Sequence, residues 1–69
     1  MKNLLAEMVR NGVTNANIQS LLDLSERAVR MKLNGESPFL YLEIEKIRDA
    51  YFPGMRLEYL MAREERKAG

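Results

Sequence analysis

The sequence predicts an all-α protein, and three observations support that prediction. Leu, Met, Ala, Glu, Arg and Lys dominate the 69 residues, whereas β-branched residues are few and scattered, a composition that favours helices over strands. Apolar residues recur three and four positions apart, which is the spacing of one helix face. Asn-Gly or Pro-Gly pairs follow several of these apolar runs and are typical helix ends. A chain of this length forms one domain, which we place at residues 1–69.

The first two helices are expected at about residues 2–11 and 15–22. In the first, apolar residues recur at helical spacing until Asn11 and Gly12 end the run; they are Leu4, Leu5, Met8 and Val9. Thr14 stands where the N-cap of the second helix belongs. The apolar face of this second helix follows at positions i, i+3 and i+4, namely Ile18, Leu21 and Leu22.

A third helix is expected at about residues 26–34. The segment before it is so short that only a tight turn fits there, beginning at Asp23. Ser25 is a suitable N-cap for the new helix. Val29 and Leu33 then fall on one face, which predicts that this side packs into the core and that the opposite side meets solvent.

The last two helices are expected between about residues 38 and 66. Ser37 and Pro38 indicate a loop or a helix start, because proline fits the first helical turn. The apolar stripe of the fourth helix consists of Leu40, Ile44, Ile47 and Tyr51. Pro53 and Gly54 end this helix. A fifth helix begins near Arg56 and leads into a charged tail; its apolar residues are Leu57, Leu60 and Met61.

The charge of the chain sets only a weak limit on its function. Eleven basic and ten acidic residues leave a net charge of +1, which by itself does not indicate a nucleic-acid binder. Residues 1–35 carry five basic and three acidic side chains, and residues 36–69 carry six and seven. Basic charge is therefore mildly concentrated in the first half, and an argument for DNA binding depends on where the individual charges lie.

Several functional classes are disfavoured by what the sequence lacks. The chain contains no cysteine and no histidine, which excludes disulfides and the common zinc-ligand sets, and we expect neither a cofactor nor enzymatic activity. Glu7 and Arg10 interrupt the apolar residues near the amino terminus before the core of a signal peptide forms. No apolar run approaches the roughly 18 residues of a membrane span. We expect a cytoplasmic protein without a membrane or small-molecule partner.

The segment GVTNANIQSLLDLSERAVRMKLNG, residues 12–35, combines two short helices with a tight turn between them. A Gly-hydrophobic-Thr sequence precedes the pair and Asn-Gly follows it. In these features, and in the later segment KIRDAYFPGMRLEYLM, the chain resembles the lambda-repressor-like helix-turn-helix family of phage repressors, Cro-type proteins and related small regulators. The resemblance covers nearly the entire chain. It implies a compact five-helix DNA-binding domain with its helix-turn-helix at about residues 14–34.

Three positions depart from the usual pattern of this family. Gln19 stands where the family usually has Ala, at the close crossing of the two helices, and Asp23 stands where it usually has Gly. Aspartate tolerates left-handed backbone angles better than most residues, so the turn at Asp23 is expected to form. Arg56 stands where small members often have a Ser or Thr cap.

The resemblance implies that the third helix enters the major groove and presents its outer side to base edges. Arg27 and Arg30 are the main candidates for base contacts, because a guanidinium group can donate to guanine O6 and N7 together. Weaker candidates for base contacts are Glu26, Ala28 and Met31. Candidates for phosphate contacts are Asn15, Ser25, Lys32 and Asn34, since such contacts fix register without reading sequence.

The expected function is sequence-specific transcriptional regulation of the phage or prophage type. A homodimer would bind the two halves of a pseudo-palindromic operator in double-stranded DNA. The expected dimer interface lies in the fifth helix and consists of Leu57, Tyr59, Leu60 and Met61. The alternative is a helix-turn-helix scaffold that binds proteins instead of DNA, as an antirepressor or a module that docks on another regulator. The near-neutral charge, Gln19 and Asp23 favour this alternative.

Overall fold

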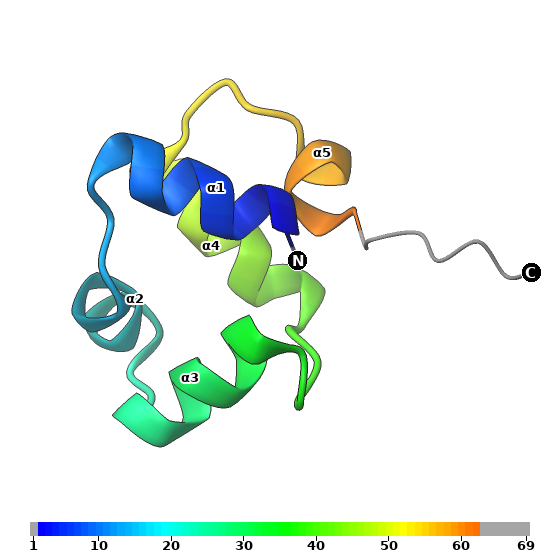
Figure 1. Ribbon diagram of the computed structural model, residues 1–69. Helices are drawn as coiled ribbons and strands as arrows, with labels where there is room; N and C mark the ends of the chain where they lie inside the picture. The colour runs from blue at the N-terminus through cyan, green and yellow to red at the C-terminus, as the bar shows by residue number, and fades with distance from the viewer. Residues whose placement is uncertain (1, 63–69) are drawn as a thin grey trace, which may run out of the picture.

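Five α-helices account for the regular structure of residues 2–62, which are the residues that the computed structural model describes (Figure 1). In chain order they are α1 (Lys2–Asn11), α2 (Asn15–Leu22), α3 (Glu26–Asn34), α4 (Tyr41–Tyr51) and α5 (Leu57–Met61). This range contains no strand, so the expectation of a compact all-α, five-helix fold is confirmed. The expected end of the fifth helix near residue 66 lies outside the described residues.

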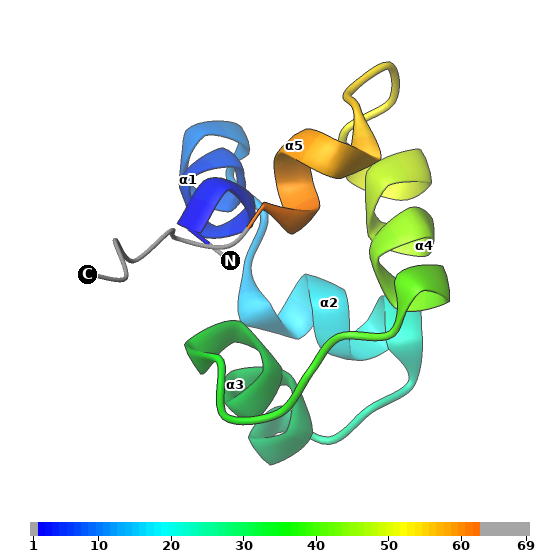
Figure 2. The same ribbon diagram turned by 90° about the vertical axis from the view of Figure 1, so that its right-hand side faces the viewer.

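The helix layers place α3 at one edge of the molecule. Figure 2 shows α5 between α1 and α4, and α2 between these helices and α3. The helices in direct contact are α1 with α5, α4 with α5, α2 with α4, and α2 with α3. The buried apolar side chains at their centre come from every helix and from two connecting segments: Leu4, Met8, Val13, Ile18, Val29, Leu33, Ile44, Ile47, Phe52 and Leu60. Because no single pair of helices encloses this core, the domain depends on all five.

The start of α4 differs from the sequence-based expectation. Leu40 has extended backbone angles (φ −82°, ψ 150°) and is the N-cap of α4, so the helix begins at Tyr41 instead of near Pro38. The Leu40 backbone N–H donates to Glu43 Oε1 at 2.9 Å, which satisfies one of the donors left free at a helix start. The Leu40 side chain therefore does not continue the buried stripe of α4, and it is 60% exposed.

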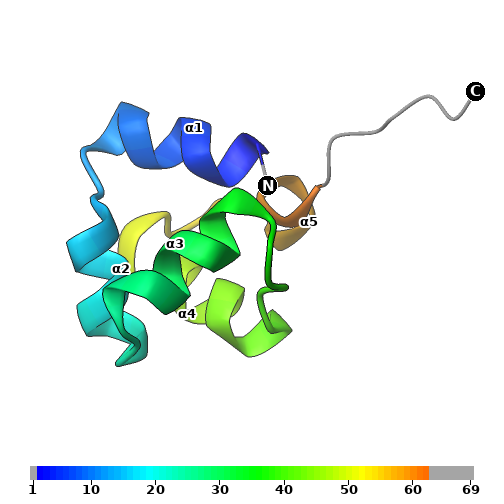
Figure 3. The same ribbon diagram turned by 60° about the horizontal axis from the view of Figure 1, so that its bottom comes forward.

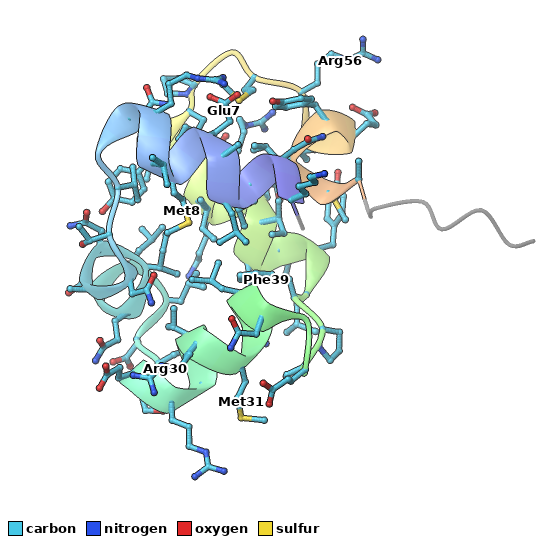
Figure 4. The ribbon with its side chains drawn as sticks, viewed as in Figure 1. Glu7, Met8, Arg30, Met31, Phe39 and Arg56 are labelled. Carbon is cyan, nitrogen blue, oxygen red and sulfur yellow. The ribbon has the colours of Figure 1, made fainter. Side chains whose placement is uncertain are left out.

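A buried carboxylate joins the first helix to the last. Glu7 is 5% exposed, and its Oε2 accepts hydrogen bonds from the Tyr59 hydroxyl at 2.8 Å and from Arg10 Nη1 at 2.7 Å. The Asn3 side-chain amide donates to the Tyr59 carbonyl oxygen at 2.7 Å. The hydrogen bond to Glu7, with some desolvation, raises the pKa of the Tyr59 phenol, because both favour the neutral form. Figure 4 shows Glu7 between α1 and the segment that leads to α5.

The packing of α5 corrects its expected role as the subunit interface at one residue. Leu60 is fully buried in the core of its own chain, so it offers no surface to a second copy. Leu57 and Met61 are half-buried and pack against the same core. Tyr59 keeps part of its ring exposed, but its hydroxyl and its carbonyl oxygen are bonded to α1. Leu60 is therefore part of the core and not of an interface, whereas an interface role for Leu57, Tyr59 and Met61 stays a prediction.

Candidate nucleic-acid interface

The turn between α2 and α3 depends on Asp23, which stands where the lambda-repressor-like family usually has Gly. Asp23 ends α2 in the left-handed conformation (φ 57°, ψ 48°) and is the non-glycine residue with positive φ among residues 2–62. Its N–H and that of Leu24 both donate to the Gln19 carbonyl oxygen, which is a typical helix end. The aspartate therefore accommodates this turn, as expected. Gln19 itself is half-buried, and α2 and α3 remain in contact.

Side-chain caps fix where both helices begin. The Thr14 hydroxyl accepts from the Asn17 N–H at 3.2 Å, while Asn17 Oδ1 accepts from the Thr14 N–H at 2.8 Å. This reciprocal pair is a capping box. At the next helix, the Ser25 hydroxyl accepts from the Ala28 N–H at 3.1 Å. Each cap stabilises its helix by about 1 kcal/mol. The cap at Ser25 therefore favours Glu26 as the first residue of α3.

The two sides of α3 have different surroundings. Val29 and Leu33 are 0% and 5% exposed and form part of the core, whereas Arg27 and Arg30 are exposed. In Figure 3, which brings the bottom of Figure 1 forward, α3 crosses the front of the molecule with no other helix covering it. The arginines therefore lie on a side of the helix that a large partner can reach.

The exposed arginines differ in their electrostatic partners. Arg30 Nη2 lies 2.8 Å from Glu26 Oε2, an i, i+4 pair in which both side chains are more than half exposed. Such surface pairs contribute only about 0.3–0.5 kcal/mol, so Arg30 is easily released to another anion. Arg27 has no ion pair with any other residue in the range 2–62.

The other residues expected at bases and phosphates surround these arginines. Ala28 and Met31 are half-buried, and Met31 projects from α3 away from the body of the molecule (Figure 4). The exposed residues at helix ends are Asn15 at the start of α2, Ser25 before α3 and Asn34 at the end of α3. Ser25 accepts a capping bond and retains its hydroxyl proton as a donor.

Lys32 does not have the place expected of a phosphate contact. Its Nζ lies 3.0 Å from Glu43 Oε1 and donates to the Pro38 carbonyl oxygen at 3.0 Å. The Lys32 and Glu43 side chains are only 13% and 15% exposed. The ammonium group also lies 5.8 Å from the centre of the Phe39 ring, within the range of a cation–π contact. Lys32 therefore joins the end of α3 to the start of α4, and it would have to give up these contacts to bind a phosphate.

An exposed apolar surface lies at the start of α4 and was not expected from the sequence. It consists of Leu40, Tyr41 and Leu42, which are 60%, 56% and 68% exposed. The unbroken apolar run FLYL, residues 39–42, could have indicated this surface. A helix cannot bury four consecutive side chains on one face, so part of such a run must be exposed. We call these three residues the 40–42 surface.

Other kinds of site have no support within the part of the chain that the structure describes. No group of three or more acidic residues there is arranged to hold a metal ion. None of its helices has the length and apolar character needed to cross a membrane. In comparisons with known proteins, no family model, no curated protein and no solved structure matches the chain.

Proposed function

We propose that residues 14–34 form a helix-turn-helix of the lambda-repressor-like type and that the protein is a sequence-specific DNA-binding transcriptional regulator. The observation that carries this proposal is the difference between the two sides of α3. Val29 and Leu33 are buried in the core on one side, whereas Arg27 and Arg30 are exposed to solvent. The left-handed turn at Asp23 and the caps of both helices agree with it.

In the proposed complex, α3 lies in the major groove with its first turns against the bases. Arg27 donates its forked N–H groups to a guanine, and Arg30 does the same once it leaves or shares its pair with Glu26. Glu26 then accepts from a cytosine amino group, and Ala28 or Met31 contacts a thymine methyl. A good bidentate contact discriminates between bases by about 1–3 kcal/mol.

Phosphate contacts come from a smaller set than the sequence suggested. Asn15, Ser25 and Asn34 remain exposed near α3 or at the start of α2, and the first-turn N–H groups of a helix have no partner within the helix. Such donors hold a phosphate in place without adding charge. Since Lys32 is paired with Glu43 and would have to leave that pair to reach a phosphate, the proposal gives the arginines the larger share of the affinity.

The mechanism that fits this geometry is occupancy of an operator by a homodimer. Two copies of α3 about 34 Å apart would enter successive major grooves on one side of a pseudo-palindromic duplex. Bound protein then excludes or recruits polymerase, which is the regulatory effect expected of a small phage-type or prophage-type regulator.

The alternative function is a helix-turn-helix scaffold that binds another protein. The 40–42 surface favours it, because contiguous exposed apolar side chains are often a site of interaction with another protein. The pairing of Arg30 with Glu26 and of Lys32 with Glu43 also leaves little free positive charge near α3.

A selection from random DNA duplexes at two salt concentrations tests the proposal. A DNA-binding regulator enriches one motif at low salt and binds it more weakly as salt rises, because phosphate contacts release counterions. If no motif is enriched at the lower salt concentration, sequence-specific DNA binding is refuted. Binding to a protein partner that is insensitive to salt would support the scaffold instead.

A further inference from the structure

We infer that the 40–42 surface, and not α5, is where two copies of this chain meet. Leu40, Tyr41 and Leu42 are consecutive and all more than half exposed. Contiguous apolar surface of this kind is often an interaction site. Among the α5 residues that the sequence offered for this role, Leu60 is buried in the core, Leu57 and Met61 pack against it, and Tyr59 is less exposed, at 39%, than any residue of the 40–42 surface.

The backbone beneath the 40–42 surface is held in place before any partner arrives. Glu43 Oε1 accepts from both the Leu40 N–H at 2.9 Å and Lys32 Nζ at 3.0 Å. Lys32 also bonds the Pro38 carbonyl oxygen, and Phe39 packs against the core. A segment that is already ordered loses little conformational entropy when it binds, so even a small contact area yields net affinity.

The charge around this surface favours a second copy over a partner of opposite charge. A two-fold contact places each patch against itself, so any net charge on it would be repelled by its own copy. Residues 38–42 carry no charge, and the charges one helical turn further along α4, the half-exposed Glu45 and the exposed Lys46, have opposite signs. The nearest charged pair, Lys32 and Glu43, is mutually neutralised and mostly buried. An uncharged apolar patch is complementary to itself.

The available area fits a weak dimer. From their exposed fractions, the three side chains offer roughly 400 Å² per protomer, or about 800 Å² for the pair, below the 1,200–2,000 Å² of stable interfaces. Dissociation in the micromolar range or weaker is therefore expected in solution. On DNA, two adjacent half-sites would hold both copies close together and raise their effective concentration. This link between dimerisation and operator binding rests on the proposed function.

The position of the surface keeps α3 accessible. In Figures 1 and 3 the loop before α4 and the start of α4 lie beside the C-terminal end of α3 and not across its outward side. A second copy seated there leaves Arg27, near the other end of α3, uncovered. Dimerisation and DNA contact are thus compatible on one molecule.

Sedimentation equilibrium of the full chain without DNA, from about 10 μM to about 1 mM, tests the contact itself. Wild type is expected to dimerise, and Leu42→Gln should raise the dissociation constant at least about tenfold, because the lost apolar burial counts once from each protomer. Leu40→Ser is a second variant that supplies a better N-cap, so it should weaken the dimer while raising the thermal midpoint. Val9→Gln is the matched control, since Val9 is 84% exposed on α1 and should leave the dimer unchanged.

A wild-type chain that stays monomeric at about 1 mM, or a dimer that Val9→Gln disrupts and Leu42→Gln does not, overturns the inference. A second measurement separates it from the proposed function. On a duplex with two half-sites, Leu42→Gln should lose cooperativity and keep wild-type affinity for a single half-site. Dimerisation through residues 40–42 with no DNA binding would overturn the proposed function and leave the contact intact.

Discussion

Replacing Arg27 by alanine is expected to separate DNA reading from folding more cleanly than any other change in the chain. The side chain is exposed and makes no ion pair within residues 2–62, so its loss should alter the free energy of unfolding by less than about 0.5 kcal/mol. In the complex it would remove a bidentate contact worth about 1–3 kcal/mol, or roughly 5- to 150-fold per half-site. Arg30→Ala should cost less, because Arg30 must first give up its pair with Glu26.

Fluorescence anisotropy on the selected site and on sites with one base pair exchanged measures this effect. The exchange of the contacted guanine should weaken wild type but not Arg27→Ala, because the variant has already lost that contact. Arg56→Ala is the matched control: it removes the same charge from an exposed arginine at the end of the molecule opposite Met31 (Figure 4). Equal losses for Arg27→Ala and Arg56→Ala, or an unchanged base preference in Arg27→Ala, would show that α3 does not read the bases.

Three further predictions concern stability. Lys32→Met or Glu43→Ala should each lower the free energy of unfolding by about 1–3 kcal/mol, because the remaining charge is left mostly buried without its partner. In chemical denaturation, the double variant should lose less stability than the sum of the two single variants. If the two losses of stability add up, the pairing is contradicted. Leu60→Ala should cost about 2–5 kcal/mol by opening a cavity in the core, whereas an interface role would lower the dimer affinity and leave the monomer stable. The raised pKa of the Tyr59 phenol stabilises the fold fully below pH 10, and this contribution is lost as pH rises through the folded-state pKa. Tyr59→Phe should abolish that alkaline loss in pH-dependent thermal melts, and an unchanged alkaline limb would refute the hydrogen bond to Glu7.

The first three helices follow the sequence because their boundaries are set by neighbouring residues. Thr14 and Ser25 bond to backbone groups three positions away, and Gly35 ends α3 with a positive φ that glycine adopts without strain. A single residue type at each boundary therefore carries the information. Asp23 belongs to the same group, since its left-handed angles are a local property.

The features that the sequence did not reveal depend on contacts between distant parts of the chain. Lys32 has the pattern of a surface lysine until Glu43 and the Pro38 carbonyl oxygen are brought to it. Leu60 and Leu40 illustrate a second limit. An apolar stripe indicates that something covers it, but its spacing does not distinguish the chain's own core from another molecule. Hence the sequence placed Leu60 at an interface and Leu40 in the core, and the structure reverses both.

The bonding of α1 to α5 also determines where additional sequence can be attached. Asn3 and Glu7 hold Tyr59, so the two ends of the described chain lie close together, about midway up the right-hand part of Figure 1, whereas α3 lies at the bottom. A short peptide linker could join the two ends and allow the chain to be reopened at a loop elsewhere, for example at Gly54. Because the contacts between α1 and α5 already hold the described ends close together, such a rearrangement would change the order of the helices in the chain and leave their packing unchanged.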